Sequence, residues 1–198
     1  MLLSCTQVFA HAIWLEREGE KNYLYFGEFS HAKKEKSGKL LDKITPNGDY
    51  KRLEDRIELI NREKKGDLTA IVEMPARKMK DSQELVQTIF YTRNGRTSTQ
   101  SLLPLDLVAK KPQSNYFTLL FENKALAKAE VIVTAPSKWE KRFRTNKKGE
   151  LSIQTPYKGL YMIEVVHKQD QKRYVYTLTF FVEKGLFWAY DPECQEKR

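Results

Sequence analysis

The sequence predicts an all-β protein built as a two-lobed β-sandwich. Short segments rich in β-branched and aromatic residues recur along the chain, and many alternate apolar with polar side chains, as strands with one buried face do. Glycine, asparagine and aspartate fall between these segments, and none of them keeps the period of an amphipathic helix. At 198 residues the chain is long enough to bury a sizeable apolar core.

The first lobe is expected over residues 11–109. Its first aromatic strand follows the turn Glu18-Gly19-Glu20, and the charged stretch 31–43 is expected to be a loop with one helical turn. Residues 65–67, KGD, separate two branched apolar segments and predict that these form a hairpin. The predicted strands of this lobe span residues 22–29, 55–61, 67–74, 88–92 and 105–108.

The second lobe is expected over residues 113–183, after a basic, proline-containing junction at 110–112. Residues 146–149, NKKG, predict the turn of a hairpin between the strands on either side. A polar tail is expected over residues 184–198. The predicted strands of this lobe span residues 116–122, 129–135, 138–145, 151–154, 159–166 and 173–182.

The charge balance is basic, with 35 Lys and Arg against 26 Asp and Glu, a formal net charge of +9. Such an excess brings nucleic acid and anionic membrane surfaces into consideration as partners. The basic residues form short clusters interrupted by acidic or aromatic side chains, without a basic helix to enter a groove, so we expect no nucleic-acid partner. No apolar run approaches the roughly 18 residues needed to span a bilayer, so we expect membrane contact to be peripheral at most.

The chain opens MLLSCTQVFAHAIWLE, which we interpret as the remnant of an export signal over residues 1–10. The letters VFA form an A-x-A-like cleavage site, and a cut after Ala10 leaves His11 as the first residue of a periplasmic protein. A lipoprotein signal acylated at Cys5 is one alternative, and a cytosolic protein whose first strand begins near Thr6 is another. After cleavage, Cys194 has no second cysteine for an intramolecular disulfide.

A family resemblance covers residues 10–183. The segments AHAIWLE, YFGEFSHAKKEKSGKLLDKI and ENKALAKAEVIVTAPSKWEKRFRTNKKGELSIQTPYKGLYMIEVVH resemble a periplasmic family of unassigned function, once described as NikM-like nickel-transport components. The resemblance implies export, an immunoglobulin- or transthyretin-like second lobe, and a link to nickel or cobalt handling. The chain differs from the family in its few histidines and in the lysines of its middle segment.

The candidate metal ligands are the three histidines, His11, His31 and His167. A free N-terminal His11 would offer its α-amine and ring Nδ1 to one ion, and a second histidine would complete the nitrogen set of a histidine brace. His167 ends a predicted strand and matches a histidine of the resembled family, while His31 follows a strand in a lysine-rich segment. Glu28 is the carboxylate expected to neutralise the ion or orient a ligand ring. Each of these side chains also fits a purely structural place at a strand edge.

These observations predict an exported, non-enzymatic protein that binds Ni²⁺, Co²⁺ or Cu²⁺ as an accessory of metal uptake, with a metal-transporter membrane component as partner. Two alternatives stay open: a metal-free binding or scaffolding module of the cell envelope, and a histidine-brace copper oxidase or monooxygenase. The sequence contains no Gly-x-Ser-x-Gly elbow, phosphate-binding glycine loop or H-E-x-x-H motif.

Overall fold

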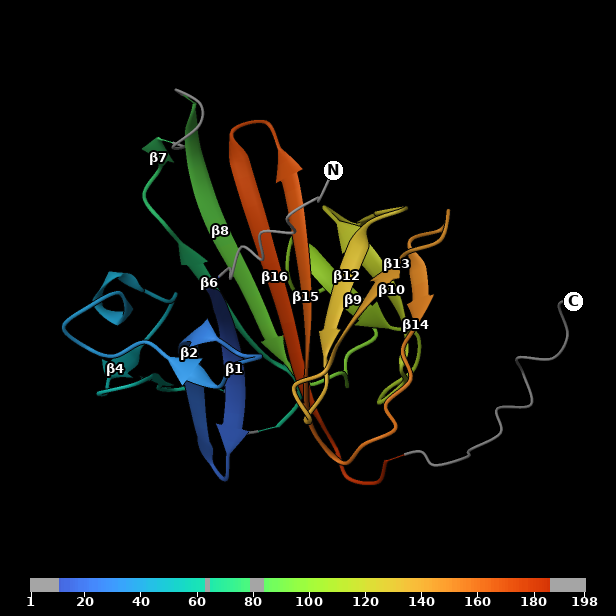
Figure 1. Cartoon of the computed structure of the whole chain (residues 1–198), viewed down its shortest axis with the longest axis horizontal. Helices are drawn as coiled ribbons and strands as arrows, with labels where there is room; N and C mark the ends of the chain where they lie inside the picture. Colours follow the sequence, from blue (N-terminus) through green and yellow to red (C-terminus); the bar gives the residue numbers. More distant parts are fainter. Residues whose placement is uncertain (1–10, 63–64, 79–83, 186–198) are drawn as a thin grey trace, which may run out of the picture.

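The computed structural model describes residues 11–62, 65–78 and 84–185, which form an all-β fold (Figure 1). This confirms the predicted class. The described part of the chain contains one short 3₁₀ turn, η1 (Leu41–Lys43), inside the segment expected to hold a helical turn, and no helix long and apolar enough to span a membrane. The strands are β1 (Ala12–Glu18), β2 (Lys21–Glu28), β3 (Lys33–Lys34), β4 (Tyr50–Arg52), β5 (Ile57–Leu59), β6 (Leu68–Glu73), β7 (Arg77–Lys78), β8 (Leu85–Asn94), β9 (Leu105–Ala109), β10 (Tyr116–Phe121), β11 (Lys124–Ala125), β12 (Glu130–Thr134), β13 (Glu140–Arg144), β14 (Glu150–Ser152), β15 (Gly159–Gln169) and β16 (Lys172–Val182).

Part of the predicted organisation lies outside the described residues. This applies to the export signal expected over residues 1–10, to Cys5 and Cys194, and to residues 186–198 of the expected polar tail.

A seven-stranded central sheet runs through the molecule in the order β13-β12-β15-β16-β8-β6, with β7 paired to β8. Its longest strands, β15 and β16, form an antiparallel hairpin in which Ile163 lies opposite Leu178. On its other side β16 pairs in parallel with β8, where Tyr176 lies opposite Tyr91. Strands from both sides of the expected junction at 110–112 therefore share one sheet. The expected lobes at 11–109 and 113–183 placed these strands in separate parts of the molecule. Parallel pairing joins segments that are distant in sequence, so no local pattern signals it.

A four-stranded sheet packs against one face of the central sheet and makes the β-sandwich predicted from the sequence. Its order is β11-β10-β14, with β9 on the other edge of β10. Alternate residues of β10 are buried, as the apolar and polar alternation of its sequence requires. The core between the two sheets includes Leu105, Leu107, Phe117, Leu119, Tyr161, Ile163, Tyr176 and Leu178. Burying side chains of this size stabilises the fold by about 1.5–3 kcal/mol each.

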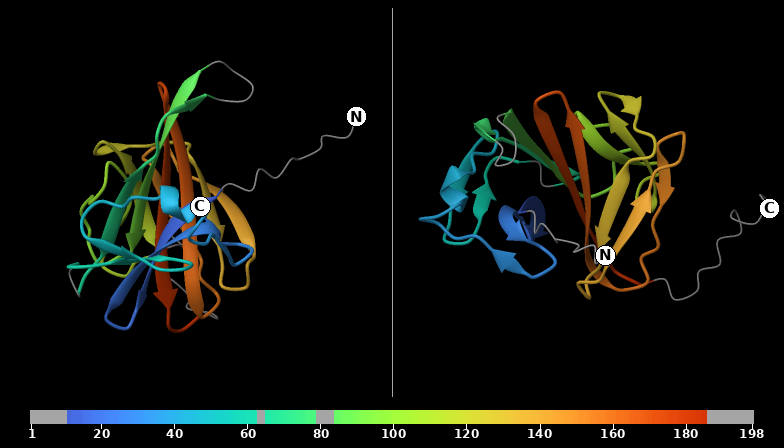
Figure 2. Two further views of the ribbon diagram at one scale, coloured as in Figure 1. Left: turned by 90° about the vertical axis from the view of Figure 1, so that its left-hand side faces the viewer. Right: turned by 45° about the horizontal axis from the view of Figure 1, so that its top comes forward.

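The N-terminal sheet, in the order β1-β2-β5-β4 with β3 on β2, meets the opposite face of the central sheet with its β1 edge. The hydroxyl of Thr177 donates to the carbonyl oxygen of Ile13 at 2.6 Å, and that of Thr179 donates to the carbonyl oxygen of Leu15. The right view of Figure 2 shows this blue sheet on the side of β8 and β16 away from the yellow strands. One face of the N-terminal sheet packs with Phe90 and Val175, and the other with Met162.

In two predicted hairpins the flanking strands do not pair with each other. β5 pairs with β2 and β4, whereas β6 pairs with β8, so the segment that contains Gly66 links two different sheets. At 146–149 the turn forms as predicted, with the amide of Gly149 donating to the carbonyl of Asn146. However, β13 pairs with β12 and β14 pairs with β10. Turn residues predict where the chain reverses, while the burial of both strand faces decides which strands pair.

Candidate functional site

His11 precedes β1, and two contacts fix its ring. Nε2 lies 2.8 Å from Oε1 of Glu35, and the ring centroid lies 5.2 Å from that of Phe26. Phe26 lies in β2 opposite Ile13, and Glu35 directly follows β3, with its amide donating to the carbonyl of Phe26. The side chain of His11 is 32% exposed and that of Glu35 only 13%, so the contact is partly shielded from solvent.

Gly27 makes this arrangement sterically possible. It lies opposite Ala12 on one side and Lys34 on the other. A Cβ at this position would lie 2.1 Å from the carbonyl oxygen of Lys33, and the φ of 152° is one that side-chain-bearing residues rarely adopt. A larger residue would push β3 away from β2, and with it the carboxylate of Glu35.

Glu28 and His31 form a second pair at the end of β2. Nδ1 of His31 lies 3.8 Å from one oxygen of Glu28, and Nζ of Lys33 lies 3.6 Å from the other. Since Ala12 lies opposite Gly27, His11 and Glu28 are the next residues along these two paired strands. The carboxylates of Glu28 and Glu35 therefore belong to the same corner of the N-terminal sheet as His11.

His167 lies elsewhere, on the side of the central sheet that faces the four-stranded sheet. Its ring centroid is 4.6 Å from that of Phe121 and 6.2 Å from that of Tyr174, its cross-strand neighbour. Its Nε2 is buried without a hydrogen-bond partner among the described residues. His11 packs with Phe26 of the other core, so the two histidines do not converge on one site.

The structure thus joins His11 to Glu35 and Glu28 to His31, and separates both pairs from His167. Within residues 11–62, 65–78 and 84–185, no group of three or more His, Cys, Asp or Glu side chains is arranged to hold a metal ion. Sequence analysis missed Glu35, because its contact with His11 depends on two successive strand pairings around Gly27. The pairing of Glu28 with His31, three residues apart, is visible in the sequence as a carboxylate close to an imidazole.

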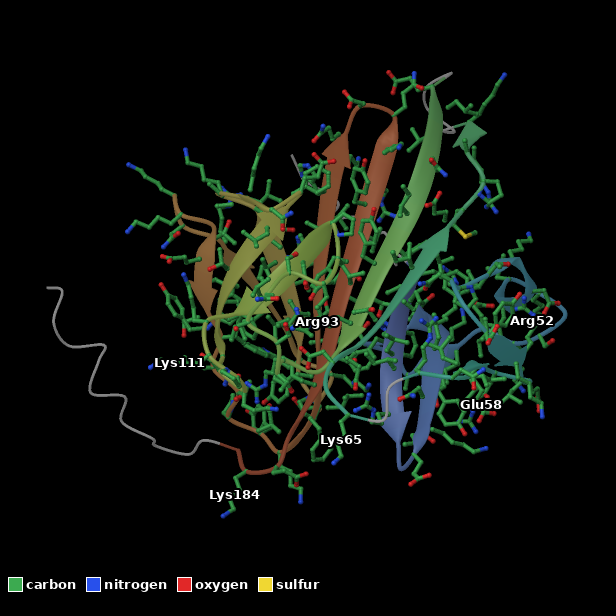
Figure 3. The ribbon with its side chains drawn as sticks, turned by 180° about the vertical axis from the view of Figure 1, so that it is seen from behind. Arg52, Glu58, Lys65, Arg93, Lys111 and Lys184 are labelled. Carbon is green, nitrogen blue, oxygen red and sulfur yellow. The ribbon has the colours of Figure 1, made fainter. Side chains whose placement is uncertain are left out.

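A second polar cluster is built around Arg93, in the interior beside the central sheet (Figure 3). Its guanidinium donates to Asp106 at 3.0 and 3.1 Å and also contacts Asp67, and the hydroxyl of Tyr176 donates to Asp106 at 2.9 Å. Burial raises the pKa of Asp67. Hydrogen bonds from the amides of Thr97 and Ser98 and from Arg93 outweigh this and hold it below its usual value. The donors and acceptors satisfy one another, so we assign the cluster a structural role between β8 and β9.

Comparisons with family models, with curated proteins and with solved structures returned no significant match.

Proposed function

We propose that the protein is an exported, periplasmic, non-enzymatic metal-binding protein that holds Ni²⁺, Co²⁺ or Cu²⁺ at His11. In this proposal His11 is the first residue of the mature chain, and its α-amine and Nδ1 chelate the ion. The observation that carries the proposal is the 2.8 Å contact between His11 Nε2 and Glu35 Oε1.

The contact with Glu35 supports the chelate because of the tautomer it selects. An ionised carboxylate only accepts hydrogen bonds, so Nε2 is the nitrogen that carries the proton. The lone pair then lies on Nδ1, the ring nitrogen that can form a chelate with the amine of the same residue. Metal-ligating histidines commonly donate their other ring N–H to a carboxylate, which fixes the ring and increases its basicity.

The charges around His11 also suit a divalent cation. Glu35 and Glu28 bring two carboxylates to this corner, and Lys33 offsets part of the charge of Glu28. Imidazole and amine nitrogens with nearby carboxylates are a donor set that borderline divalent ions accept. His167 takes no part in this site. A chelate by one residue leaves coordination positions open, which fits transfer of the ion to an uptake component in the membrane.

The test uses a chain that starts at His11, prepared by removing an N-terminal tag without leaving extra residues, and the same chain with its amine acetylated. Calorimetric titration with Cu²⁺ and with Ni²⁺ is expected to give one site in the free-amine form and at least 100-fold weaker binding in the acetylated form. Glu35→Gln is expected to weaken binding by about 10–100-fold. His167→Ala, the matched histidine control, is expected to leave the affinity unchanged.

Equal affinity of the free and acetylated chains would exclude the chelate and leave the metal-free scaffold as the better function. Export is tested separately, by the intact mass of the protein recovered from a periplasmic extract. A mature chain that does not start at His11 would exclude the site in the cell.

A further inference from the structure

A cleft of about 280 Å³ lies between the N-terminal sheet and the turn that joins β12 to β13. It is lined by Trp14 and Glu16 of β1, Phe29, Ala32 and Lys34 around β3, Pro136 and Lys138 of the turn, and Leu160 of β15. We infer that this cleft binds a small aromatic carboxylate, with the ring against the apolar wall and the carboxylate between the two lysines. The site lies on the face of the N-terminal sheet opposite the His11–Glu35 pair and does not depend on metal binding.

The apolar wall of the cleft is rigid. Trp14 is 1% exposed and Phe29 is 6% exposed, and their rings meet edge to face with centroids 5.4 Å apart. Tyr25 stacks on the other side of the indole, with centroids 5.5 Å apart. The indole N–H donates to Glu16 at 2.8 Å, so its orientation is fixed as well. Because these aromatic faces already have partners, the ligand ring would lie against the ring edges that line the cleft and against Pro136 and Leu160.

Two ammonium groups lie at the cleft without a carboxylate in ion-pair contact within the described residues. Lys138 Nζ donates to the carbonyl of Phe29 at 3.0 Å and lies 4.3 Å from the Phe29 ring centroid. Lys34 Nζ lies 3.7 Å from the ring centroid of Tyr25. Burial lowers the pKa of Lys138, with Glu16 opposing and Lys34 adding to the shift, so these three charges interact across the cleft. An anion between the lysines would relieve their mutual repulsion.

The turn that carries Lys138 holds this residue in the left-handed region of backbone conformation. The amide of Lys138 donates to the carbonyl of Ala135, and that of Ala135 to the carbonyl of Trp139, which closes a three-residue loop. Lys138 has φ 66°, and Ala32 on the facing loop has φ 52°. The last position of such a loop favours glycine. Lys138 occupies this position and lines the cleft.

Charge and size select the class of ligand. Two lysines and Glu16 leave one net positive charge, which matches a monocarboxylate better than a phosphate dianion. The volume of about 280 Å³ lies just below the roughly 300–1,000 Å³ typical of small-molecule sites. A single ring with a short carboxylate arm, such as phenylacetate, fits these limits.

Ligand-observed NMR on the metal-free full chain tests the inference with phenylacetate, its neutral amide and phenyl phosphate. Phenylacetate is expected to bind at least 10-fold more tightly than either analogue. Lys34→Met is expected to weaken its binding by at least 10-fold, Lys138→Arg to retain it, and Lys124→Met, a control in β11 outside the cleft, to leave it unchanged. Equal binding of acid and amide, or unchanged binding in Lys34→Met, would overturn the carboxylate site, and preference for phenyl phosphate would overturn its class. His11→Ala is expected to leave phenylacetate binding intact, which separates this result from failure of the metal site.

Discussion

The hydroxyl of Thr177 in β16 donates a 2.6 Å hydrogen bond to the carbonyl oxygen of Ile13 in β1, 164 residues away in sequence. β1 is the edge strand of the N-terminal sheet, and it has β2 as its one ladder partner within the described residues. Thr179 makes the equivalent contact with Leu15 two residues further on. Threonine side chains on a face of the central sheet thus cover the β1 edge of the N-terminal sheet. Without them this edge would be open to pairing with a further strand.

Thr177→Val is expected to lower the free energy of unfolding by about 1–3 kcal/mol, because it keeps the side-chain shape and removes the buried hydroxyl that donates to the carbonyl of Ile13. Urea denaturation measures the loss. Thr118→Val, on a partly exposed threonine of β10, is the matched control and is expected to change stability by less than about 0.5 kcal/mol. Equal losses in the two variants would show that the Thr177 hydroxyl does not stabilise the contact between the sheets.

Arg93→Met is expected to destabilise the fold by about 3–5 kcal/mol, because it removes the guanidinium that the buried carboxylates of Asp67 and Asp106 both contact. Guanidinium chloride denaturation measures this. Adding Asp106→Asn to Arg93→Met is expected to recover part of the loss, since one uncompensated charge is removed. A double variant less stable than the single one would contradict the electrostatic origin of the effect.

Glu164→Gln is expected to stabilise the protein at pH 7 by about 1 kcal/mol. Burial raises the pKa of Glu164 from 4.5 to about 6, with Arg173 opposing the shift and Glu140 adding to it. The folded protein therefore holds this proton more tightly than the unfolded chain. The stability that the protonated Glu164 contributes is complete below about pH 4.5 and is lost as the pH rises through about 6.

Denaturation at a series of pH values checks this expectation. Glu164→Gln should remove the fall in stability over that range, whereas Glu84→Gln, on an exposed residue before β8, should retain it. If the free energy of unfolding of Glu164→Gln still falls between about pH 4.5 and 6, the fall comes from another titratable group.

Gly27→Ala is expected to cost about 2 kcal/mol or more, because the added Cβ meets the carbonyl oxygen of Lys33 and forces β3 outward. Gly38→Ala is the matched control, with a positive φ of 81° and no atom within 4 Å of the added Cβ, and should cost about 1 kcal/mol. Thermal melts compare the two. Gly27→Ala should also weaken metal binding at His11, whereas Gly38→Ala should not.

The sequence predicted the strands well because alternation and turn residues are local signals. The segments that became β2, β8, β10, β12, β15 and β16 were all expected within a few residues of their observed bounds. Strand pairing was less predictable. The parallel contact of β8 with β16 and the separation of β5 from β6 depend on which faces are buried, and that is decided by the whole fold.

The residues of the candidate site were also predictable only in part. His11 and Glu28 could be chosen from residue type and position, while Glu35 becomes a neighbour of His11 only through the close approach of two strands at Gly27. The cleft of Trp14, Lys34 and Lys138 joins segments that are about 100 residues or more apart in the sequence, so no motif could mark it. Sequence identified residues able to do chemistry, and the fold decided which of them meet.

The parallel pairing of β8 with β16 has a consequence for the newly made chain. β8 has only β6 and β7 as partners until the ribosome has added almost all of the second half, so one edge of a long apolar strand stays open throughout synthesis. Completion of the central sheet must therefore wait for release of β16, and the exposed β8 edge is where a chaperone would be needed. The many long-range contacts favour slow folding, so aggregation during expression should respond more to growth temperature and translation rate than to changes on the finished surface.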